Sequence, residues 1–218
     1  MQILVIGCGK QGSTISNELL KEGFEVTVAD NSPYNLEKFK GASKELVDIN
    51  DLPSFKKLLQ KFKFAVNALP SKFGAKVIKL TIEQGVNLVD VSFLPEDVFT
   101  FHNSAQNAGV TIITDCGVAP GLSNICAGNA YKRFKKPTRL KIYVGGVPQQ
   151  SVPPLNLCVT FCPEDLFEEY TRKVRIKENG IIKEVPPLSG IEAIEFEIND
   201  NKCEFECFYT DGLRTLLR

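Results

Sequence analysis

Met1-Gln-Ile-Leu-Val-Ile-Gly-Cys-Gly-Lys-Gln-Gly12 is the stretch that decides the fold of this chain. Residues 2–6 form an apolar run with β-branched members, which predicts a buried strand. Gly7-x-Gly9-x-x-Gly12 follows at once, and a helical pattern begins at Ser13. A strand, a glycine turn and a helix in this order are typical of a dinucleotide-binding βα unit, whose glycines permit a tight turn, close approach of a pyrophosphate and close packing of the helix.

An acidic residue follows the next predicted strand at the spacing that such a unit requires. Residues 24–29 form a second apolar strand pattern, and Asp30 lies 18 positions after Gly12 (30 − 12). A carboxylate at this place hydrogen-bonds two ribose hydroxyls and repels a 2′-phosphate, so we expect NAD as the cofactor, with NADP less favoured. The alternative is that Asp30 only begins a turn with Asn31.

Strand and helix patterns alternate through the first 121 residues. Strands are predicted at 2–6, 24–29, 43–49, 64–67, 87–91 and 110–113, and helices at 13–20, 33–39, 52–61, 77–84 and 96–107. Such alternation predicts an α/β fold, a Rossmann-type doubly wound parallel sheet.

Ligands of such sheets bind at the carboxyl ends of the strands, so the residues there are the candidate cofactor contacts. They are Gly7, Gly9, Lys10, Gln11, Gly12, Asp30, Asn67, Ala68, Leu69, Pro70, Asp90, Ser92, Gly117 and Pro120. Taken singly, each of these loops could equally be a plain connection. Their predicted convergence on one edge of the sheet favours a functional role.

The pattern changes near Leu122, after which a helix is expected to residue 134. Strand patterns follow at 140–144, 155–161, 174–176, 191–198 and 203–209, with one helix pattern at 163–170. Strands without long intervening helices predict a smaller α+β domain with a mixed or antiparallel sheet. We therefore expect a NAD-binding domain at 1–121 and a substrate-binding or dimerisation domain at 122–218.

Composition limits the partners and the compartment. Lys plus Arg and Asp plus Glu both count 26, so no global field favours nucleic acid or an anionic membrane. No apolar run approaches the ~18 residues of a membrane span, and no signal-peptide pattern opens the chain. Seven cysteines, an odd number, favour reduced thiols in the cytoplasm.

Two cysteine pairs and the single histidine need separate interpretations. Cys158 with Cys162, and Cys203 with Cys207, could each present two sulfurs on one strand face, so a zinc site is conceivable. Neighbouring phenylalanines favour ordinary strand packing instead, and no metal is expected. His102 is predicted within a helix, away from the strand ends, and so as a packed or surface residue and not a base. The basic run between residues 132 and 141 is typical of a solvated face.

Several motifs resemble the saccharopine dehydrogenase-like family, and within it the lysine 6-dehydrogenases. They are Gly7-x-Gly9-x-x-Gly12, Asn67-Ala68-Leu69, Val89-Asp90, residues 108–113, Asp115-Cys-Gly-Val-Ala-Pro-Gly-Leu-Ser-Asn124, Tyr143-x-Gly145-Gly146-x-Pro148, Glu184-Val-Pro186 and Thr210-Asp211-Gly212. The resemblance implies a Rossmann domain, a second domain whose sheet also serves a homodimer, and NAD(P)-dependent oxidation of a C–N bond in lysine or a lysine adduct.

The chain departs from the family pattern in two ways. Family members continue beyond the Thr210-Asp211-Gly212 segment, whereas this chain ends at Arg218, so we expect a shortened C-terminal part. A cysteine-bearing stretch, 158–162, replaces a tryptophan-bearing one, and the chain has no Trp, which disfavours saccharopine itself as substrate.

Oxidation of an amine requires its nitrogen to be neutral, so a carboxylate is expected near the substrate. Asp90 and Asp115 are the candidate catalytic residues, although Asp115 could instead hold the following turn. Cys116, Gly145 and Arg214 are the candidate substrate contacts, Arg214 for a substrate carboxylate. Three functions remain open: an amino-acid dehydrogenase of the lysine and saccharopine type, a catalytically impaired nucleotide-binding relative, and a polyamine-precursor dehydrogenase.

Overall fold

The computed structural model describes residues 1–148, 150, 152–155 and 157–218, and the chain divides into two compact units. The first comprises Met1–Gly117 and the second Val118–Arg218. The division lies four residues before the position that the sequence suggested (121 − 117). No described helix is long and apolar enough to cross a membrane.

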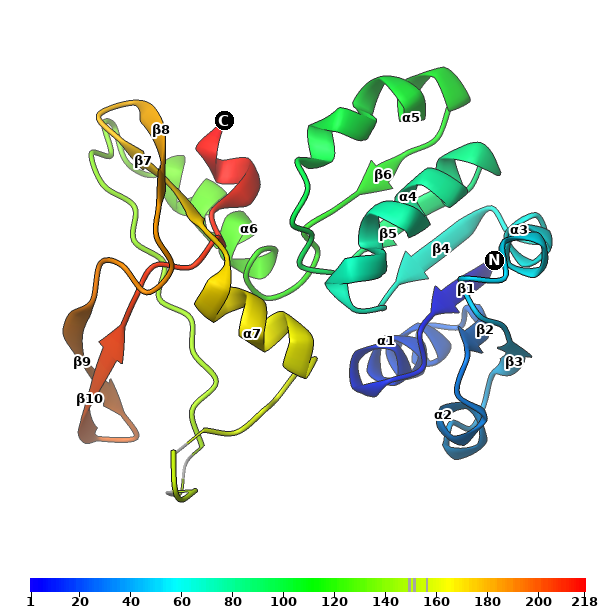
Figure 1. The fold of residues 1–218 in the computed structure, drawn as a ribbon, viewed down its shortest axis with the longest axis horizontal. Coiled ribbons are helices and arrows are strands. Elements are labelled where there is room, and N and C mark those ends of the chain that lie inside the picture. The colour runs from blue at the N-terminus through cyan, green and yellow to red at the C-terminus, as the bar shows by residue number, and fades with distance from the viewer. Residues whose placement is uncertain (149, 151, 156) are drawn as a thin grey trace. The chain divides into compact units, whose positions relative to one another are not determined.

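The first unit is a six-stranded parallel sheet with helices on both faces (Figure 1). Its elements are β1 Gln2–Ile6, α1 Lys10–Lys21, β2 Glu25–Asp30, α2 Pro33–Lys38, β3 Ser43–Leu46, α3 Leu52–Leu59, β4 Phe64–Asn67, η1 Ser71–Phe73, α4 Gly74–Glu83, β5 Asn87–Asp90, η2 Val98–Phe101, α5 His102–Ala108 and β6 Ile112–Ile113. The strand order β3-β2-β1-β4-β5-β6 is that of the Rossmann fold, which confirms the predicted fold class.

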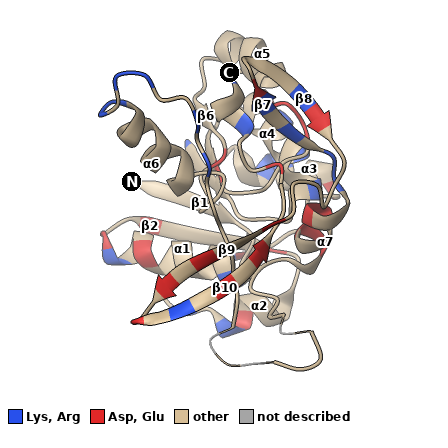
Figure 2. Cartoon of the chain, turned by 90° about the vertical axis from the view of Figure 1, so that its left-hand side faces the viewer, with Lys and Arg blue, Asp and Glu red and all other residues tan. Residues whose placement is uncertain are grey.

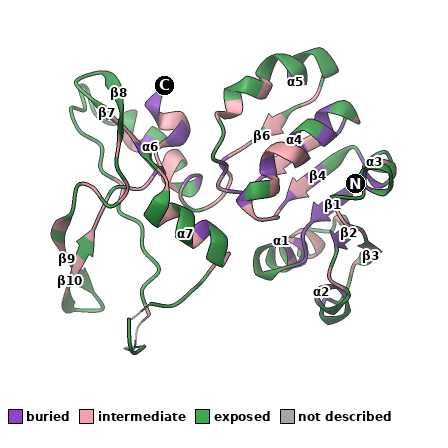
Figure 3. Cartoon of the chain, in the orientation of Figure 1, coloured by how far each residue is buried: buried purple, intermediate pink, exposed green. Residues whose placement is uncertain are grey.

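The alternation of β1 divides the apolar core between the two faces of the sheet. Leu4 and Ile6 point to a core that is completed by α3, α4 and α5. Val5 points the other way, into a core completed by α1 and α2. Because successive side chains of a strand face opposite sides, a central strand with helices on both faces must be apolar throughout. β1 is buried from Ile3 to Ile6 (Figure 3), and its first residue, Gln2, is exposed.

Helix boundaries in the first unit follow the local chemistry. Ser32 and Asp51 cap α2 and α3 by accepting hydrogen bonds from the N–H groups of Asn35 and Ser54. The helix predicted at 96–107 instead begins as a 3₁₀ turn, η2, because Asp97 accepts the N–H of Phe99 and starts a tighter turn. The last strand is shorter than predicted and pairs with β5 over two residues only.

In its described residues, the second unit carries two separate antiparallel hairpins, two α-helices and a short 3₁₀ helix. Its elements are α6 Leu122–Tyr131, α7 Pro163–Thr171, β7 Val174–Glu178, β8 Ile181–Val185, β9 Glu192–Ile198, β10 Asn201–Cys207 and η3 Arg214–Leu217. β7 pairs with β8, and β9 pairs with β10. The antiparallel pairing confirms the predicted character of this half, but each sheet has only two strands.

Two predicted strands of the second unit are wrong. Residues 140–144 and the described residues of 155–161 are not strands, and Asn156 lies outside the described residues. Apolar side chains there remain exposed, including Val144 and Leu155. A strand requires a hydrogen-bonding neighbour, and the hairpin strands pair only with each other. The pattern also missed β8, whose exposed residues lack a clean alternation.

Candidate functional site

The glycine loop between β1 and α1 has the shape that a diphosphate requires. Gly7 has a φ of 98°, and a Cβ added to it would lie 3.0 Å from the carbonyl oxygen of Ala68. A Cβ on Gly12 would lie 1.8 Å from the carbonyl oxygen of Gly7, so only glycine lets α1 pack this closely. A Cβ on Gly9 would meet nothing within 4 Å. The protein's own backbone therefore closes the space at Gly7 and Gly12, whereas the space beside Gly9 is open to a ligand.

The loop lies at the point where the strand order reverses, between β1 and β4. Ala68 donates its N–H to the carbonyl of Ile6 at 2.8 Å, which brings residues 67–70 beside the glycine loop. Gly9 is the N-cap of the twelve-residue α1, and the exposed Lys10 and Gln11 open its first turn. The first N–H groups of a helix have no acceptors within it, so this end suits the phosphates of a dinucleotide.

Asp30 ends β2 and joins the glycine loop to the turn that follows. Its Oδ2 accepts the N–H of Cys8 at 2.6 Å, and its Oδ1 accepts the N–H of Ser32 at 2.8 Å. The side-chain amide of Asn35 lies 3.4 Å from the same carboxylate. Asp30 thus begins the turn that follows β2, and the hydrogen bonds to its carboxylate hold it beside the glycine loop. Burial and the charge of Asp30 raise the pKa of the Cys8 thiol.

Asp90 ends β5 and is completely buried. The side-chain amide of Asn67 donates to its Oδ2 at 2.9 Å, and Ser92 donates both its N–H, at 2.7 Å, and its hydroxyl to Oδ1. Burial raises the pKa of the Asp90 carboxyl, and the hydrogen bonds from Ser92 and Asn67 oppose that effect. Three strand-end residues of the predicted site therefore form one bonded group.

Asp115 and Cys116 follow β6 close to this group. Asp115 is 7 % exposed and has a φ of 57°, a backbone conformation that few residues other than glycine adopt. Cys116 donates its N–H to the carbonyl of Asp90 at 3.0 Å. Burial, with the charges of Asp115 and Asp90, raises the pKa of the Cys116 thiol. The two candidate acids are thus neighbours at the carboxyl ends of β5 and β6, and the half-buried Gly117 ends the unit.

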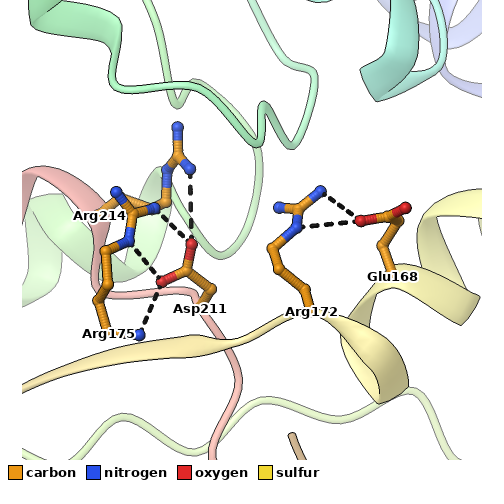
Figure 4. Close-up of polar contacts among 5 residues, drawn as sticks. All are labelled: Glu168, Arg172, Arg175, Asp211 and Arg214. Atoms are coloured by element: carbon orange, nitrogen blue, oxygen red, sulfur yellow. Dashed lines mark hydrogen bonds and ion pairs between the residues drawn. The ribbon is translucent and has the colours of Figure 1, made fainter. Parts of the chain in front are cut away.

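The remaining predicted residues belong to the second unit. Arg214 is buried and its Nη1 lies 3.7 Å from Asp211 Oδ2 (Figure 4). Arg175 contacts the same carboxylate through its backbone N–H, its Nε and its Nη2. Two guanidinium groups therefore share one buried carboxylate, and Arg172 pairs separately with Glu168. Pro120 is buried, whereas Gly145 is exposed.

The cysteines other than Cys8 and Cys116, and the histidine, lie outside these clusters. All seven cysteines are free thiols, and Cys162 donates to the Glu164 carboxylate at 3.0 Å. Among the described residues, no group of three or more His, Cys, Asp or Glu side chains could hold a metal ion. His102 is exposed and begins α5.

Sequence reasoning missed two residues of these clusters. A Cβ on Gly74, the first residue of α4, would lie 2.6 Å from Ser92 Oγ and 2.1 Å from Leu94 Cδ2. Asp211 was noted only as part of a motif, but it holds both arginines. Gly74 meets Ser92 and Leu94, and Asp211 meets Arg175, across long stretches of chain, so no local pattern shows these contacts; only Arg214 is close to Asp211 in the sequence.

The Rossmann strand order and the closed glycine turn define a dinucleotide-binding protein. Comparison with known families agrees. Residues 3–113 match the saccharopine dehydrogenase NADP binding domain, and residues 117–216 match the saccharopine dehydrogenase C-terminal domain. The chain belongs to the saccharopine dehydrogenase family, which is a family of dehydrogenases, as the resemblance implied.

Individual relatives are distant. The chain is 24% identical over 160 residues to a saccharopine dehydrogenase [NADP(+), L-glutamate-forming] of Pyricularia oryzae, covering 67% of this chain and 34% of the relative. It is 25% identical over 212 residues to carboxyaminopropylagmatine dehydrogenase of Synechocystis, covering 86% and 52%. The apo saccharopine dehydrogenase (L-Glu forming) of Saccharomyces cerevisiae shares the fold, with a TM-score of 0.74, 20% identity, and coverage of 96% of this chain and 49% of that one.

Two facts qualify the sequence-based expectations. The chain spans about a third to a half of the length of these relatives. The family description and the name of the fungal relative both specify NADP, which favours NADP over the NAD expected from Asp30. A nicotinamide cofactor is common to both interpretations.

Proposed function

We propose that this chain is the nucleotide-binding and substrate-binding part of an oxidoreductase that acts on the C–N bond of lysine or a lysine-derived amino acid. The observation that carries the proposal is the glycine loop. Gly12 is closed by the protein's own backbone, while the space above Gly9 is open beside the first turn of α1. This combination suits a bound diphosphate.

The residues of the first unit would bind the cofactor and prepare the substrate nitrogen. A bound nicotinamide supplies the acceptor for the hydride that leaves the carbon bearing the nitrogen. The loop at residues 67–70 would line the nicotinamide side, because Ala68 lies against Gly7. Asp115 is the carboxylate that we assign to take the proton of the substrate amine, since it follows β6 at the carboxyl end of the sheet.

The residues of the second unit would hold the carboxylate of an amino-acid substrate. Arg214 and Arg175 both contact the buried carboxylate of Asp211. Guanidinium groups bind carboxylates in a fixed geometry, so Arg214 is our candidate for that contact, with Gly145 as a further candidate. Cys116 is the candidate substrate contact of the first unit.

Binding and turnover test the proposal in turn. Titration with NADH and NADPH, followed by the fluorescence of the reduced nicotinamide, should give a micromolar dissociation constant for one of them. Reduction of NAD or NADP should then be recorded with saccharopine, lysine and carboxyaminopropylagmatine. Binding without turnover on any of these amines would favour the catalytically impaired relative, and absence of binding would refute the proposal.

A polyamine-precursor dehydrogenase is the second candidate, and one observation favours it. The alignment with carboxyaminopropylagmatine dehydrogenase of Synechocystis covers 86% of this chain and 52% of that relative. Turnover of carboxyaminopropylagmatine at least tenfold faster than of saccharopine would support it.

A further inference from the structure

We infer that Asp90 is a positioning residue that fixes the strand ends of β4 and β5 beneath the dinucleotide, and not the group that takes the amine proton. The inference rests on the proposed function, since it concerns the same cofactor site. It reassigns one of the two acids that the sequence offered as catalytic.

The contacts of Asp90 are those of an enclosed acceptor. Its side chain is completely buried, and both carboxylate oxygens accept hydrogen bonds from Asn67 or Ser92. Gly74 closes the neighbouring space, since even a Cβ at that position would overlap Ser92 and Leu94. A group that takes a proton from a substrate must reach it within hydrogen-bond distance or through one water, whereas both oxygens of Asp90 are already directed at donors of Asn67 and Ser92.

Asn67 connects Asp90 to the segment that lies against the glycine loop. Its Oδ1 accepts the N–H of Leu69 at 3.2 Å, while its Nδ2 donates to Asp90. Between them, Ala68 donates to Ile6 at 2.8 Å and lies against Gly7. A change in the orientation of the Asn67 amide would therefore move the loop that abuts the diphosphate site.

Each hydrogen bond of this group has a fixed donor and a fixed acceptor. The N–H of Leu69 requires an oxygen from residue 67, so the amide nitrogen of Asn67 must face residue 90. Residue 90 must then accept from Asn67 and from both donors of Ser92, which only an acceptor-only carboxylate does. In D90N, the new amide nitrogen at position 90 would face the amide nitrogen of Asn67, so that two donors meet. In N67D, the new carboxylate at position 67 would face the carboxylate of Asp90, so that two acceptors meet.

An exchange of the two residues restores the complementarity. In D90N/N67D, residue 67 would accept from Leu69 and from the new amide at position 90, whose oxygen would still accept from Ser92. We expect D90N and N67D each to weaken binding of the preferred reduced cofactor about tenfold, the loss of one buried hydrogen bond. The double variant should return to within about threefold of the wild-type dissociation constant.

The experiment measures cofactor dissociation constants and apo-protein melting temperatures for the wild type, both single variants and the double variant. N87A is the matched control, because Asn87 lies at the opposite end of β5 and bridges Lys63 and Thr111 in the same manner. It should lower the melting temperature and leave the dissociation constant unchanged. S92A, which removes one hydroxyl donor, should weaken binding about threefold and serves if a single variant does not fold.

The outcomes separate the inference from the proposed function. A wild-type protein that binds neither NADH nor NADPH refutes the function itself. Wild-type binding that D90N leaves unchanged, or a double variant as weak as the single ones, overturns the positioning role. Where a substrate turns over, the double variant should keep kcat within about threefold, whereas loss of a base would lower it about a hundredfold or more.

Discussion

Asp30 is the residue at which two lines of evidence on the cofactor diverge. Its carboxylate lies beside the glycine loop, and positions 31–34 after it carry no Lys or Arg to hold a 2′-phosphate. The family description nevertheless specifies NADP. The prediction of NAD rests on Asp30 alone, because a carboxylate beside the ribose repels a dianionic phosphate.

The substitution D30N tests this preference while keeping the shape of the side chain. Removal of the charge should lower the ratio of the NADPH to the NADH dissociation constant about tenfold, since the repulsion of the 2′-phosphate is lost. D48N is the control, because Asp48 makes the same hydrogen bond to the N–H two residues later and lies after β3. A wild-type protein that already prefers NADPH, or an unchanged ratio in D30N, would contradict the NAD preference predicted from Asp30.

At this scale, the sequence predicted which residues stand at the strand ends but not how their side chains are paired. The positions of Asn67, Asp90 and Ser92 follow from where apolar runs stop. Their mutual hydrogen bonds depend on the register between β4 and β5, which places Asn67 opposite Asp90. That register arises from the packing of the whole sheet, so no local pattern contains it.

At the scale of elements, the contact between β1 and α1 supports the glycine loop. G12A places a methyl group 1.8 Å from the Gly7 carbonyl oxygen, so the helix must separate from the strand. We expect a loss of several kcal/mol of unfolding free energy, comparable to overpacking a core. Chemical denaturation of the two proteins measures it.

G9A is the informative counterpart in the same loop. A Cβ at this position meets nothing within 4 Å, so the free energy of unfolding should stay within about 1 kcal/mol of the wild type. The methyl group would instead occupy the space proposed for the diphosphate and weaken cofactor binding at least tenfold. Equal destabilisation by the two substitutions, or unimpaired binding by G9A, would refute this division of roles.

Prediction of elements succeeded where the pattern has a strong local cause. The helices α2 and α3 begin at Pro33 and Leu52, each after a capping residue that the sequence shows directly. The strands expected at 140–144 and 155–161 had suitable composition, but β-propensity describes fit to a pleated surface and not pairing itself. The hairpin β7–β8 shows the reverse case, because its Asn179-Gly180 turn forms although β8 has little apolar alternation.

At the scale of the whole chain, the two units differ in how completely they bury apolar surface. The central strands of the first unit are covered on both faces, whereas the hairpins of the second unit are mostly exposed (Figure 3). The succession of apolar strand patterns and helix patterns in the sequence therefore predicted almost all of the first unit. The same patterns predicted the second unit less well, because a segment there forms a strand only where another segment pairs with it.

The hairpin β9–β10 has one acidic face and one apolar face. Glu195, Glu197, Glu204 and Glu206 alternate with Ile194, Phe196, Ile198 and Phe205 along the two strands, and Figure 2 shows the acidic residues on the hairpin. Tyr143 covers part of the apolar face through an edge contact with Phe196, whose ring centroid is 5.8 Å away. Phe196 and Ile198 nevertheless remain 40% and 45% exposed.

We propose that this apolar face pairs with a second copy of the chain, as the family resemblance implies. The wild-type molar mass from light scattering during gel filtration should then be twice that of one chain at micromolar concentration. F196E should give the single-chain mass, because a charge at the centre of an apolar interface is costly to desolvate. E204Q, on the acidic face, should leave the dimer intact. A wild-type protein with the single-chain mass, or an F196E variant that remains dimeric, would place the contact elsewhere or exclude it.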